Sequence, residues 1–305
     1  MALNLHLLRL FAAVAEHGSF SHAADALHVS QPAVSKGVRE FESQVGTALL
    51  ERGAGGVRPT EAGQRLLIQA RALFAAERAA EEELDGFRGL QRGSLAIGAS
   101  TTIATYLLPP LLGAFSRRRP EIELHLTSAN TRAIAERLVA RELDIALVEG
   151  PTKEFNLRAA PWRRDELALI AAPDHRLARL SASVVLTALE QEIFLIREPG
   201  SGTREVVASA LAKYKLRPRR TIEIGSTEAI KQMVASGFGV AIVSAAAAID
   251  QIALKRLTVI RPPRFAVHRA LMRLTLHGRP MSAAAAAFDR LLDDEAERAT
   301  ATDDA

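Results

Sequence analysis

The sequence contains no cysteine. Disulfide bridges and thiolate metal sites are therefore excluded, and a reducing compartment is compatible with the chain. The histidines include no His-x-x-x-His pair of the kind that binds zinc on a helix, so we expect neither a metal ion nor another cofactor. Uninterrupted apolar runs of about 18 residues, the length of a membrane span, are also missing.

The N-terminal stretch "MALNLHLLRLFAAVAEHG" is apolar, but it lacks the basic start of a signal peptide. His6, Arg9 and Glu16 fall at helical spacing within it, which indicates a folded helix. We therefore expect a cytoplasmic protein with no membrane partner.

The size of the chain predicts at least two domains, because 305 residues are too many for one compact core. Hydrophobic residues make up 48% of the sequence and charged residues 24%, as in globular proteins. The formal net charge of +4 is only a weak hint of a polyanionic partner.

Two short amphipathic helices are predicted at the start of the chain. Their apolar residues follow the i, i+3, i+4, i+7 spacing, and Gly18 stands where the first helix would end. We expect Ser21 to cap the second helix, and the small Ala23 and Ala24 would let another helix approach closely. The two apolar stripes are Leu7, Leu10, Phe11 and Val14, and then Phe20, Ala23, Ala24 and Leu27.

A third helix is predicted within "HVSQPAVSKGVREFESQVG", residues 28–46, with Ser30 as its cap and Pro32 in its first turn. The three helices together form a helix-turn-helix, and a plain helical bundle is the alternative. The apolar positions of the third helix are Val34, Val38, Phe41 and Val45, which leaves Gln31, Ser35, Lys36 and Arg39 pointing outward.

The outward face of this third helix favours DNA binding. Gln31 can hydrogen-bond a base edge, and the ring of Pro32 can touch a thymine methyl group. Ser35, Lys36 and Arg39 can reach bases or phosphates. Acidic and basic residues balance over residues 1–65, so the prediction depends on where the bases lie and not on net charge.

Residues 49–63, "LLERGAGGVRPTEAG", predict a small hairpin, or wing, with glycines at its turn. Arg52 and Arg58 bracket that turn. Such a pair suits contact with phosphates or the minor groove, whereas a flexible connector is the alternative.

Residues 18–63 resemble the winged helix-turn-helix of LysR-type transcriptional regulators, and the similarity continues along the chain in order and length. Ser30 to Ala33, Ser35 and Thr60 to Gly63 sit where the family pattern has them. Lys36 stands where the family often has arginine, which keeps the charge but loses a bidentate fork. The resemblance implies a DNA-binding domain over residues 1–60, whose candidate contacts are Ser21, Ser30, Gln31, Pro32, Ser35, Lys36, Arg39, Arg52 and Arg58.

A long helix is predicted from Thr60, a good cap, to about Leu90, because no proline interrupts this stretch. Its seam residues alternate spacings of four and three, as in a heptad repeat, and a second copy of the chain is the expected partner. A helix packed on its own domain is the alternative, since Glu77 breaks the seam. The seam positions are Leu66, Ala70, Leu73, Glu77, Ala80, Leu84 and Phe87.

The family resemblance implies the same role, a linker helix over residues 61–92 that forms a homodimer and often a homotetramer. Two recognition helices about 34 Å apart would then read half-sites one DNA turn apart.

Strand and helix patterns alternate over residues 93–297, which predicts an α/β domain. The predicted strands cover 94–100, 121–128, 144–150, 166–173, 193–200, 221–226 and 239–244, and the helices 102–118, 131–141, 203–214 and 227–236.

The resemblance implies a two-lobed effector domain, similar to periplasmic solute-binding proteins. Its first lobe would take in about 93–164 and 269–297, and its second about 165–268. The crossings should fall near Trp162 to Glu166 and Ala266 to Ala270. The last residues, 298–305, are expected to form a disordered tail.

Three junctions between a strand and a helix share a chemistry that suits anions. Residues 98–102, 198–204 and 225–229 place small hydroxyl side chains and free backbone N–H groups at helix starts. Asn130 and Thr131 mark a fourth junction. Plain helix capping is the alternative at each one, but strand ends of this kind lie together between lobes.

The expected ligand is therefore a small anion such as a carboxylate, a phosphate or a sulfur oxyanion. The candidate effector-binding residues are Ser100, Thr101, Thr102, Asn130, Thr131, Ser201, Gly202, Thr203, Ser226 and Thr227.

The stretches "ASTTIATYLLP" and "REPGSGTRE" look most like family members tied to carbon-dioxide fixation or sulfur metabolism. The partners that the resemblance implies are double-stranded DNA, a small anionic effector, further copies of the chain and RNA polymerase.

An enzyme or a solute-binding protein on the same two-lobed fold is the main alternative function. The sequence has no G-x-S-x-G elbow and no G-x-x-x-x-G-K-[ST] loop, and no histidine is spaced to serve Ser201 as a base. Neither alternative needs a helix-turn-helix on a dimer-forming helix. The sequence therefore predicts a regulator and not an enzyme.

Overall fold

The computed structural model describes residues 3–53, 56–87, 93–150, 156–180 and 186–303. The chain divides into two compact units, Met1–Leu84 and Asp85–Ala305, which are described separately. Within the described ranges, no helix is long and apolar enough to cross a membrane.

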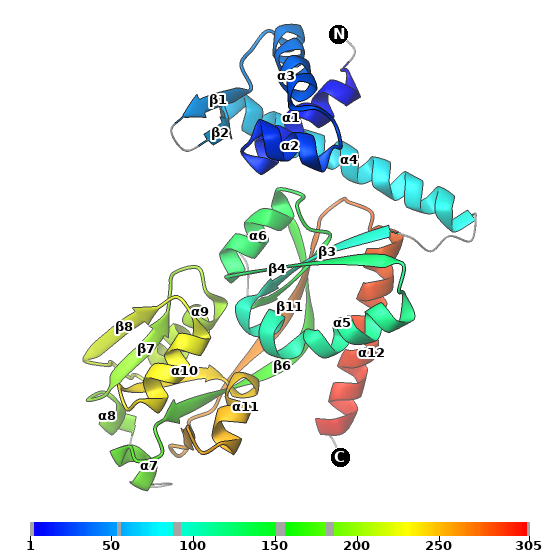
Figure 1. Cartoon of the computed structure of the whole chain (residues 1–305). Helices are drawn as coiled ribbons and strands as arrows, with labels where there is room; N and C mark the ends of the chain where they lie inside the picture. Colours follow the sequence, from blue (N-terminus) through cyan, green and yellow to red (C-terminus); the bar gives the residue numbers. More distant parts are fainter. Residues whose placement is uncertain (1–2, 54–55, 88–92, 151–155, 181–185, 304–305) are drawn as a thin grey trace. The chain divides into compact units, whose positions relative to one another are not determined.

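The first unit consists of helices and one hairpin (Figure 1). Its elements are α1 (Leu5–His17), α2 (Phe20–Ala26), α3 (Gln31–Val45), β1 (Leu50–Gly53), β2 (Gly56–Pro59) and α4 (Glu61–Phe87). The predicted helix-turn-helix and wing are both present, with β1 and β2 paired antiparallel.

Helix caps fix the start and end of each helix in this unit. Gly18 ends α1 in the left-handed conformation at φ 63°, as its position in the sequence predicted. The Ser30 hydroxyl accepts the Ala33 N–H at the start of α3. The prediction that Ser21 caps α2 was wrong: Ser19 lies before the helix, and its hydroxyl accepts the His22 N–H.

The core of the first unit lies between α1, α2, α3 and the first half of α4. Phe11 and Phe41 meet at its centre, with ring centroids 6.1 Å apart. Leu67, Ala70 and Phe74 of α4 pack into the same core. Ala70 was expected to face a second copy of the chain, but it is fully buried against its own unit, because this half of the seam covers the three-helix core.

The second unit begins with the elements of a first lobe (Figure 1). These are β3 (Gly93–Ser100), η1 (Ile103–Leu107), α5 (Pro109–Arg118), β4 (Ile122–Ala129), α6 (Thr131–Val139) and β5 (Ile145–Glu149), joined later by α12 (Ala283–Asp303).

The elements of the second lobe follow. They are α7 (Arg176–Leu180), α8 (Leu186–Leu189), β7 (Ile193–Arg197), α9 (Gly202–Lys213), β8 (Arg220–Ile224), α10 (Thr227–Ala235), β9 (Val240–Ser244), α11 (Ala245–Ala253) and β10 (Thr258–Ile260).

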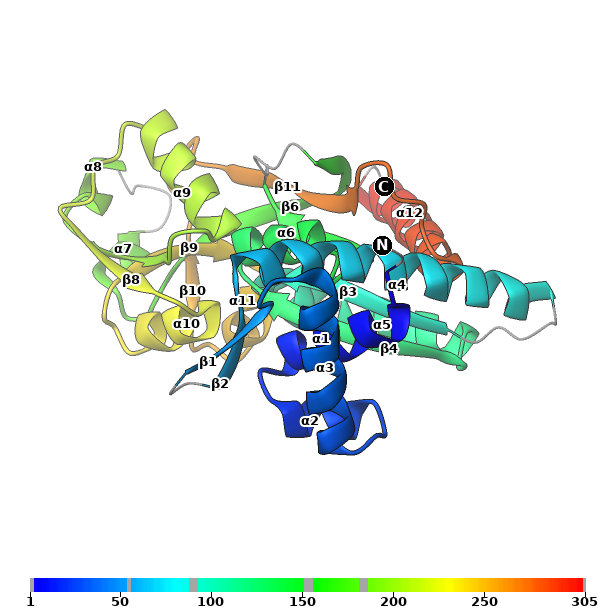
Figure 2. The same ribbon diagram turned by 90° about the horizontal axis from the view of Figure 1, so that it is seen from above.

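Two long antiparallel strands, β6 (Leu157–Ala171) and β11 (Val267–Leu276), join the lobes and run side by side in both views (Figures 1 and 2). The described strands of this unit form one sheet in the order β4-β3-β5-β11-β6-β9-β7-β8, with β10 paired to β6. On β6, Trp162 packs into the first-lobe core and Leu167 into the second. On β11, Leu271 packs into the first-lobe core and Val267 into the second-lobe core.

Helices cover both faces of the sheet in each lobe. On β5, Ile145 and Leu147 face a core shared with α5 and α12, while Ala146 and Val148 face α6. β9 alternates likewise between two cores of the second lobe. Burial on both faces explains why these strands read as continuous apolar runs.

Two predictions about helices in this unit were wrong. The single helix expected over 102–118 is divided into η1 and α5, because Pro109 and Pro110 lack the N–H groups that would continue η1. The tail expected over 298–305 is instead helical to Asp303, since no proline or glycine stops α12 there.

A buried ion cluster lies where β6 and β11 cross between the lobes. Arg269 of β11 donates to Asp165 of β6 at 2.7 Å, and its side chain is 1% exposed. Its Nη1 atom lies 3.3 Å from Glu149 Oε2 at the end of β5 and donates to Thr203 Oγ1 of α9 at 2.8 Å. The Ser244 hydroxyl donates to the free oxygen of Asp165 at 2.9 Å. One guanidinium therefore connects both lobes and both crossing strands.

Replacing this cation is expected to destabilise the second unit. Arg269→Met leaves Asp165 and Glu149 buried without their cation, and should lower the free energy of unfolding by about 3 to 5 kcal/mol in urea titrations. The exposed Arg164 on β6 supplies the matched control. Arg164→Met should change the free energy of unfolding by less than about 0.5 kcal/mol. Equal effects of the two substitutions would show that the cluster does not hold the lobes.

Candidate DNA-binding face and effector site

The exposed side of α3 carries four of the nine predicted DNA contacts. Val34, Val38 and Phe41 are buried in the first-unit core, which turns the opposite side of the helix to solvent. The exposed residues on that side include Gln31, Pro32, Lys36 and Arg39. The described part of the helix thus presents an amide and two cations, the groups that hydrogen-bond base edges and phosphates.

Ser35 does not point outward as the sequence predicted. The residue is only 8% exposed, because it lies on the side of α3 that approaches the core. Its hydroxyl accepts a hydrogen bond from Arg39 Nη2 at 3.4 Å, and its carbonyl accepts one from Arg39 Nε at 3.2 Å. Ser35 therefore orients the guanidinium of Arg39 along the helix.

The remaining predicted DNA contacts lie around α3. Ser21 is exposed on α2, and Ser30 is exposed with its hydroxyl used in the α3 cap. Arg58 is exposed on β2 of the wing. Arg52 belongs to β1, but its side chain lies outside the described part of the structure.

The predicted effector residues lie at the carboxyl ends of parallel strands in both lobes. β3, β4 and β5 run parallel in the first lobe, and β7, β8 and β9 in the second. Thr101 follows β3 and donates to the carbonyl of Ala129, the last residue of β4, at 3.5 Å. Thr131 starts α6 and donates to the carbonyl of Glu149 at 3.4 Å.

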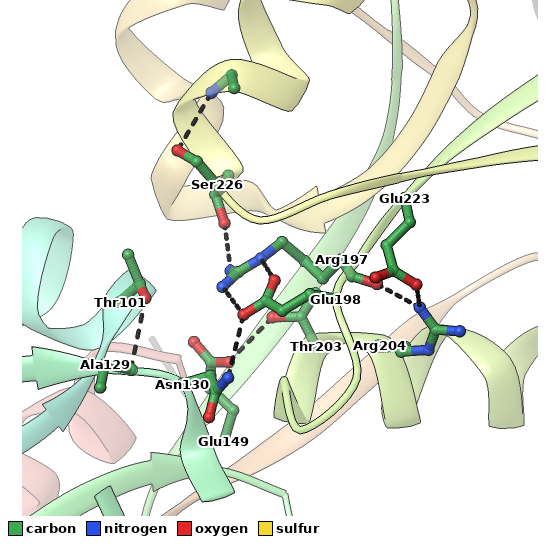
Figure 3. A network of polar contacts seen from close by, with 12 residues as sticks. Thr101, Ala129, Asn130, Glu149, Arg197, Glu198, Thr203, Arg204, Glu223 and Ser226 are labelled. Carbon is green, nitrogen blue, oxygen red and sulfur yellow. Dashed lines mark hydrogen bonds and ion pairs between the residues drawn. The ribbon is translucent and has the colours of Figure 1, made fainter. Parts of the chain in front are cut away.

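Direct contacts bring the strand ends of the two lobes together (Figure 3). Asn130 Nδ2 of the first lobe donates to Glu198 Oε1 of the second at 3.4 Å. The Arg132 N–H donates to the Gly200 carbonyl at 3.1 Å. Thr203 donates to Glu149 Oε2 at 2.9 Å. The junctions at 130–131 and 198–204 are therefore neighbours in space.

Helix capping explains some of these polar residues and not others. Ser226 accepts the Ala229 N–H at the start of α10, and Asn130 accepts the Ala133 N–H at the start of α6. Ser201 precedes α9, yet its hydroxyl makes no capping bond. The Ser100 and Ser201 hydroxyls are buried, at 1% and 2% exposure, and neither has a hydrogen-bond partner in the described part of the chain.

Arg197 is a functional candidate that the sequence did not single out. It ends β7, its side chain is 4% exposed, and its Nη1 atom donates to Thr227 Oγ1 at 2.8 Å. Its Nε and Nη2 atoms donate to the two carboxylate oxygens of Glu198 at 2.7 and 2.9 Å (Figure 3). Burial alone would raise the pKa of Glu198, but the hydrogen bonds from Arg197 outweigh it and hold that pKa below its usual value.

A second polar network joins η1 of the first lobe to α10 of the second. The Tyr106 hydroxyl donates to Glu228 Oε2 at 2.9 Å, and Lys231 Nζ lies 2.8 Å from the same oxygen. Lys231 Nζ also donates to the Ala247 carbonyl at 2.7 Å. The hydrogen bond from Lys231 holds the pKa of Glu228 below its usual value, whereas burial raises the pKa of Tyr106.

The sequence does contain a signal for the charged residues that were missed. Glu149 and Arg197 end the apolar strands "IALVE" and "IFLIR", and Arg269 precedes the apolar residues "ALM" of β11. Charged residues are rarely buried unless they are paired, so a charge that closes a buried strand indicates a partner nearby. The sequence does not say which residue that partner is.

No cluster of three or more His, Asp or Glu side chains that could hold a metal ion occurs among the residues that the structure describes. The class of protein follows from the two units: a winged helix-turn-helix unit precedes a two-lobed α/β unit with buried polar groups at its strand ends. That combination defines a DNA-binding regulator with a ligand-binding domain.

The chain belongs to the LysR family of transcriptional regulators. Residues 5–64 match the family model described as bacterial regulatory helix-turn-helix protein, lysR family, and residues 88–297 match the LysR substrate binding domain. Known relatives of the chain are named as transcriptional regulators, and the chain is a regulator and not an enzyme.

Similar proteins agree with the subgroup that the sequence suggested. The RuBisCO operon transcriptional regulator of Allochromatium vinosum is 35% identical over 298 residues, which cover 98% of either chain. The regulator CysL of Bacillus subtilis is 32% identical over 265 residues, 87% of this chain and 88% of that one. The Synechocystis PCC6803 CcmR regulatory domain in complex with 2-PG superposes with a TM-score of 0.61 at 34% identity, over 66% of this chain and 97% of that domain.

Gly202 allows the two lobes to approach at this site. A Cβ atom there would lie 2.0 Å from the Glu149 carbonyl oxygen and 2.8 Å from Thr131 Oγ1. Gly202→Ala is therefore expected to push α9 away from the first lobe and to destabilise the unit by about 1 to 3 kcal/mol, measured by thermal unfolding.

Gly225 provides the control for this substitution, because a Cβ atom there would meet nothing within 4 Å. Gly225→Ala should leave the unfolding midpoint close to that of the wild-type chain. Similar midpoints for the two alanine variants would mean that the contact at Gly202 yields easily.

Proposed function

We propose that a small anionic metabolite binds between the two lobes and thereby changes how the chain engages operator DNA. The observation that carries this proposal is the buried Ser201 hydroxyl without a partner, which lies four residues beyond the buried Arg197 guanidinium. Buried hydroxyls normally find a hydrogen-bond partner, so an unpaired one indicates a place for a bound group. A cation and hydroxyl donors together suit an oxyanion.

The chemistry of a relative supports an anion as well. The CcmR regulatory domain was solved in complex with 2-PG, and 97% of that domain superposes on this chain. Relatives named as RuBisCO operon regulators favour target genes of carbon-dioxide fixation, and the relative CysL favours sulfur metabolism. We therefore place the effector among phosphorylated or carboxylated metabolites of carbon fixation, with a sulfur oxyanion as the second candidate.

The effector can act only if it prefers one arrangement of the lobes. The lobes are joined by contacts that a ligand between them would alter, among them Asn130 to Glu198 and Tyr106 to Glu228. A second copy of the chain would transmit the change through the paired linker helices. Leu84, on the later part of α4, is 59% exposed and suits such a pairing. We place this function in the cytoplasm, with RNA polymerase as a further partner.

The candidate DNA contacts divide by chemistry. Gln31 and Pro32 would read base edges, and Lys36, Arg39 and the wing arginines Arg52 and Arg58 would contact bases or phosphates. Ser35 would act by holding Arg39. Ser21, in the first turn of α2, and Ser30, the cap of α3, would contact phosphates.

Replacing Gln31 tests the base-reading role. Gln31→Ala is expected to weaken binding to genomic fragments that the wild-type chain retains by about 1 to 3 kcal/mol, in gel-retardation titrations at fixed salt. Binding to random DNA should change little, because that binding depends on phosphate contacts.

Gln44 is the matched control, since it is an exposed glutamine near the other end of α3. Gln44→Ala should leave both affinities unchanged. If Gln31→Ala weakened binding to random DNA as much as to the retained fragments, Gln31 would not read bases.

Thermal unfolding of the full chain tests the anion site. Inorganic phosphate, sulfate and 2-PG are the probes, with glycerol as an uncharged comparison. At a hundredfold excess over its dissociation constant, a bound anion should stabilise the chain by about 2.7 kcal/mol. If no anion in the set raises the unfolding midpoint, the proposed effector class is wrong.

Two serine variants locate the site. Ser201→Ala removes a hydroxyl that has no partner in the described structure, so it should leave the anion-free midpoint unchanged and weaken the anion response. Ser226→Ala removes a cap and should cost about 1 kcal/mol with or without the anion. An anion response that Ser201→Ala leaves intact would place the anion elsewhere.

A further inference from the structure

The guanidinium of Arg197 already holds a carboxylate in the geometry that an anionic ligand would take. The Nε and Nη2 edge of arginine is a planar fork that matches two oxygens of a carboxylate or phosphate. Both oxygens on this fork come from Glu198, the next residue in the chain. The fork of the buried cation at the β7 end is therefore occupied by an internal anion.

Arg197 is fixed in place. It lies at the end of β7, which pairs with β8 and β9, and its side chain is buried. The Arg197 Nη1 atom donates to the hydroxyl of Thr227, the first residue of α10. The backbone carbonyl of Arg197 accepts a hydrogen bond from Arg204 at 2.7 Å. The cation is thus held by contacts that do not involve Glu198.

Glu198 is held much less firmly. It lies beyond the end of β7, and its side chain is 22% exposed, against 4% for Arg197. Apart from Arg197, the side-chain partner that the described structure gives it is Asn130, at a long 3.4 Å. A rotation of this side chain would free the fork and place the carboxylate in water, where its charge is solvated.

A second observation indicates that a ligand belongs here. The Ser201 hydroxyl, three residues beyond Glu198, is 2% exposed and has no partner in the described residues. Ser201 is also the residue that precedes α9, whose first N–H groups need acceptors. An oxyanion on the Arg197 fork would bring acceptor oxygens to the loop between β7 and α9. The Ser201 hydroxyl in that loop has no acceptor while Glu198 occupies the fork.

We propose that Arg197 is the cation that binds the anionic group of the effector, and that Glu198 is an internal counter-ion which the effector displaces. This inference rests on the proposed function of the interlobe site. Glu198 also accepts from Asn130 of the first lobe, so its displacement removes a contact between the lobes. Binding of the anion is thereby coupled to the arrangement of the lobes.

Glu198 competes with the anion for the fork. The apparent affinity for the anion is the intrinsic affinity multiplied by the fraction of molecules in which the fork is free. A partly exposed ion pair favours its paired state by roughly fivefold, so removing the competing charge should strengthen anion binding by about that factor. Glu198→Gln removes the charge but keeps an oxygen for Asn130. Isothermal titration of the full chain with the tightest binder among inorganic phosphate, sulfate and 2-PG measures the change.

Glu223 provides a matched control for the loss of one negative charge. Glu223 lies on β8, the strand beside β7, and it pairs with Arg204 of α9 at 2.8 Å. Its ion-pair partner is therefore Arg204 and not the Arg197 guanidinium. Glu223→Gln should change the anion affinity by less than twofold. The double variant Arg197→Gln, Glu198→Gln should lose the increase in anion affinity. It should bind the anion at least tenfold more weakly than Glu198→Gln alone.

The outcomes separate this inference from the proposed function. If the wild-type chain binds an anion and Glu198→Gln binds it with equal or lower affinity, the counter-ion role is overturned while the anion site stands. Equal gains from Glu198→Gln and Glu223→Gln would also overturn it, because they would reflect net charge alone. If no anion binds either chain, both proposals fail together.

Discussion

The arrangement of the two lobes depends on one buried cation. Arg269 lies on a strand that crosses between the lobes, and its guanidinium meets Asp165, Glu149 and Thr203. A buried charge is tolerated only while it stays paired, so these residues must remain together in every folded arrangement of the unit. Any rearrangement of the lobes must therefore keep this cluster paired.

The same requirement explains the polar groups at those strand ends. The buried cation Arg197 has an acidic partner in Glu198, and Lys231 has one in Glu228. The hydroxyls of Ser100 and Ser201 have no partner in the described residues, although they are buried as deeply. In the site that we propose, an anion would bind the Arg197 cation and the unpaired hydroxyls, and Glu198 would be the internal carboxylate that it displaces.

Much of this structure could be predicted from local patterns. The stripes of α1 and α3, the Ser30 cap and the alternation of strands and helices each follow from periodicity and from capping chemistry. What the sequence could not supply were facts that depend on tertiary neighbours. Burial of Ser35 and the partners of Arg197 and Arg269 depend on the tertiary fold: Asp165 and Glu149, for example, lie 104 and 120 positions from Arg269 in the sequence. Ser19 and Ser21 are both possible caps for α2, and the path of the chain in the folded unit makes Ser19 the cap.

The most direct test of an anion between the lobes is a diffraction experiment on crystals of the chain grown with selenate, an oxyanion whose selenium scatters anomalously. We expect an anomalous peak within hydrogen-bond distance of the Arg197 guanidinium or the Ser201 hydroxyl, at the strand ends where the lobes meet. Anomalous peaks confined to exposed surface lysines and arginines, with these strand ends empty at saturating selenate, would contradict it.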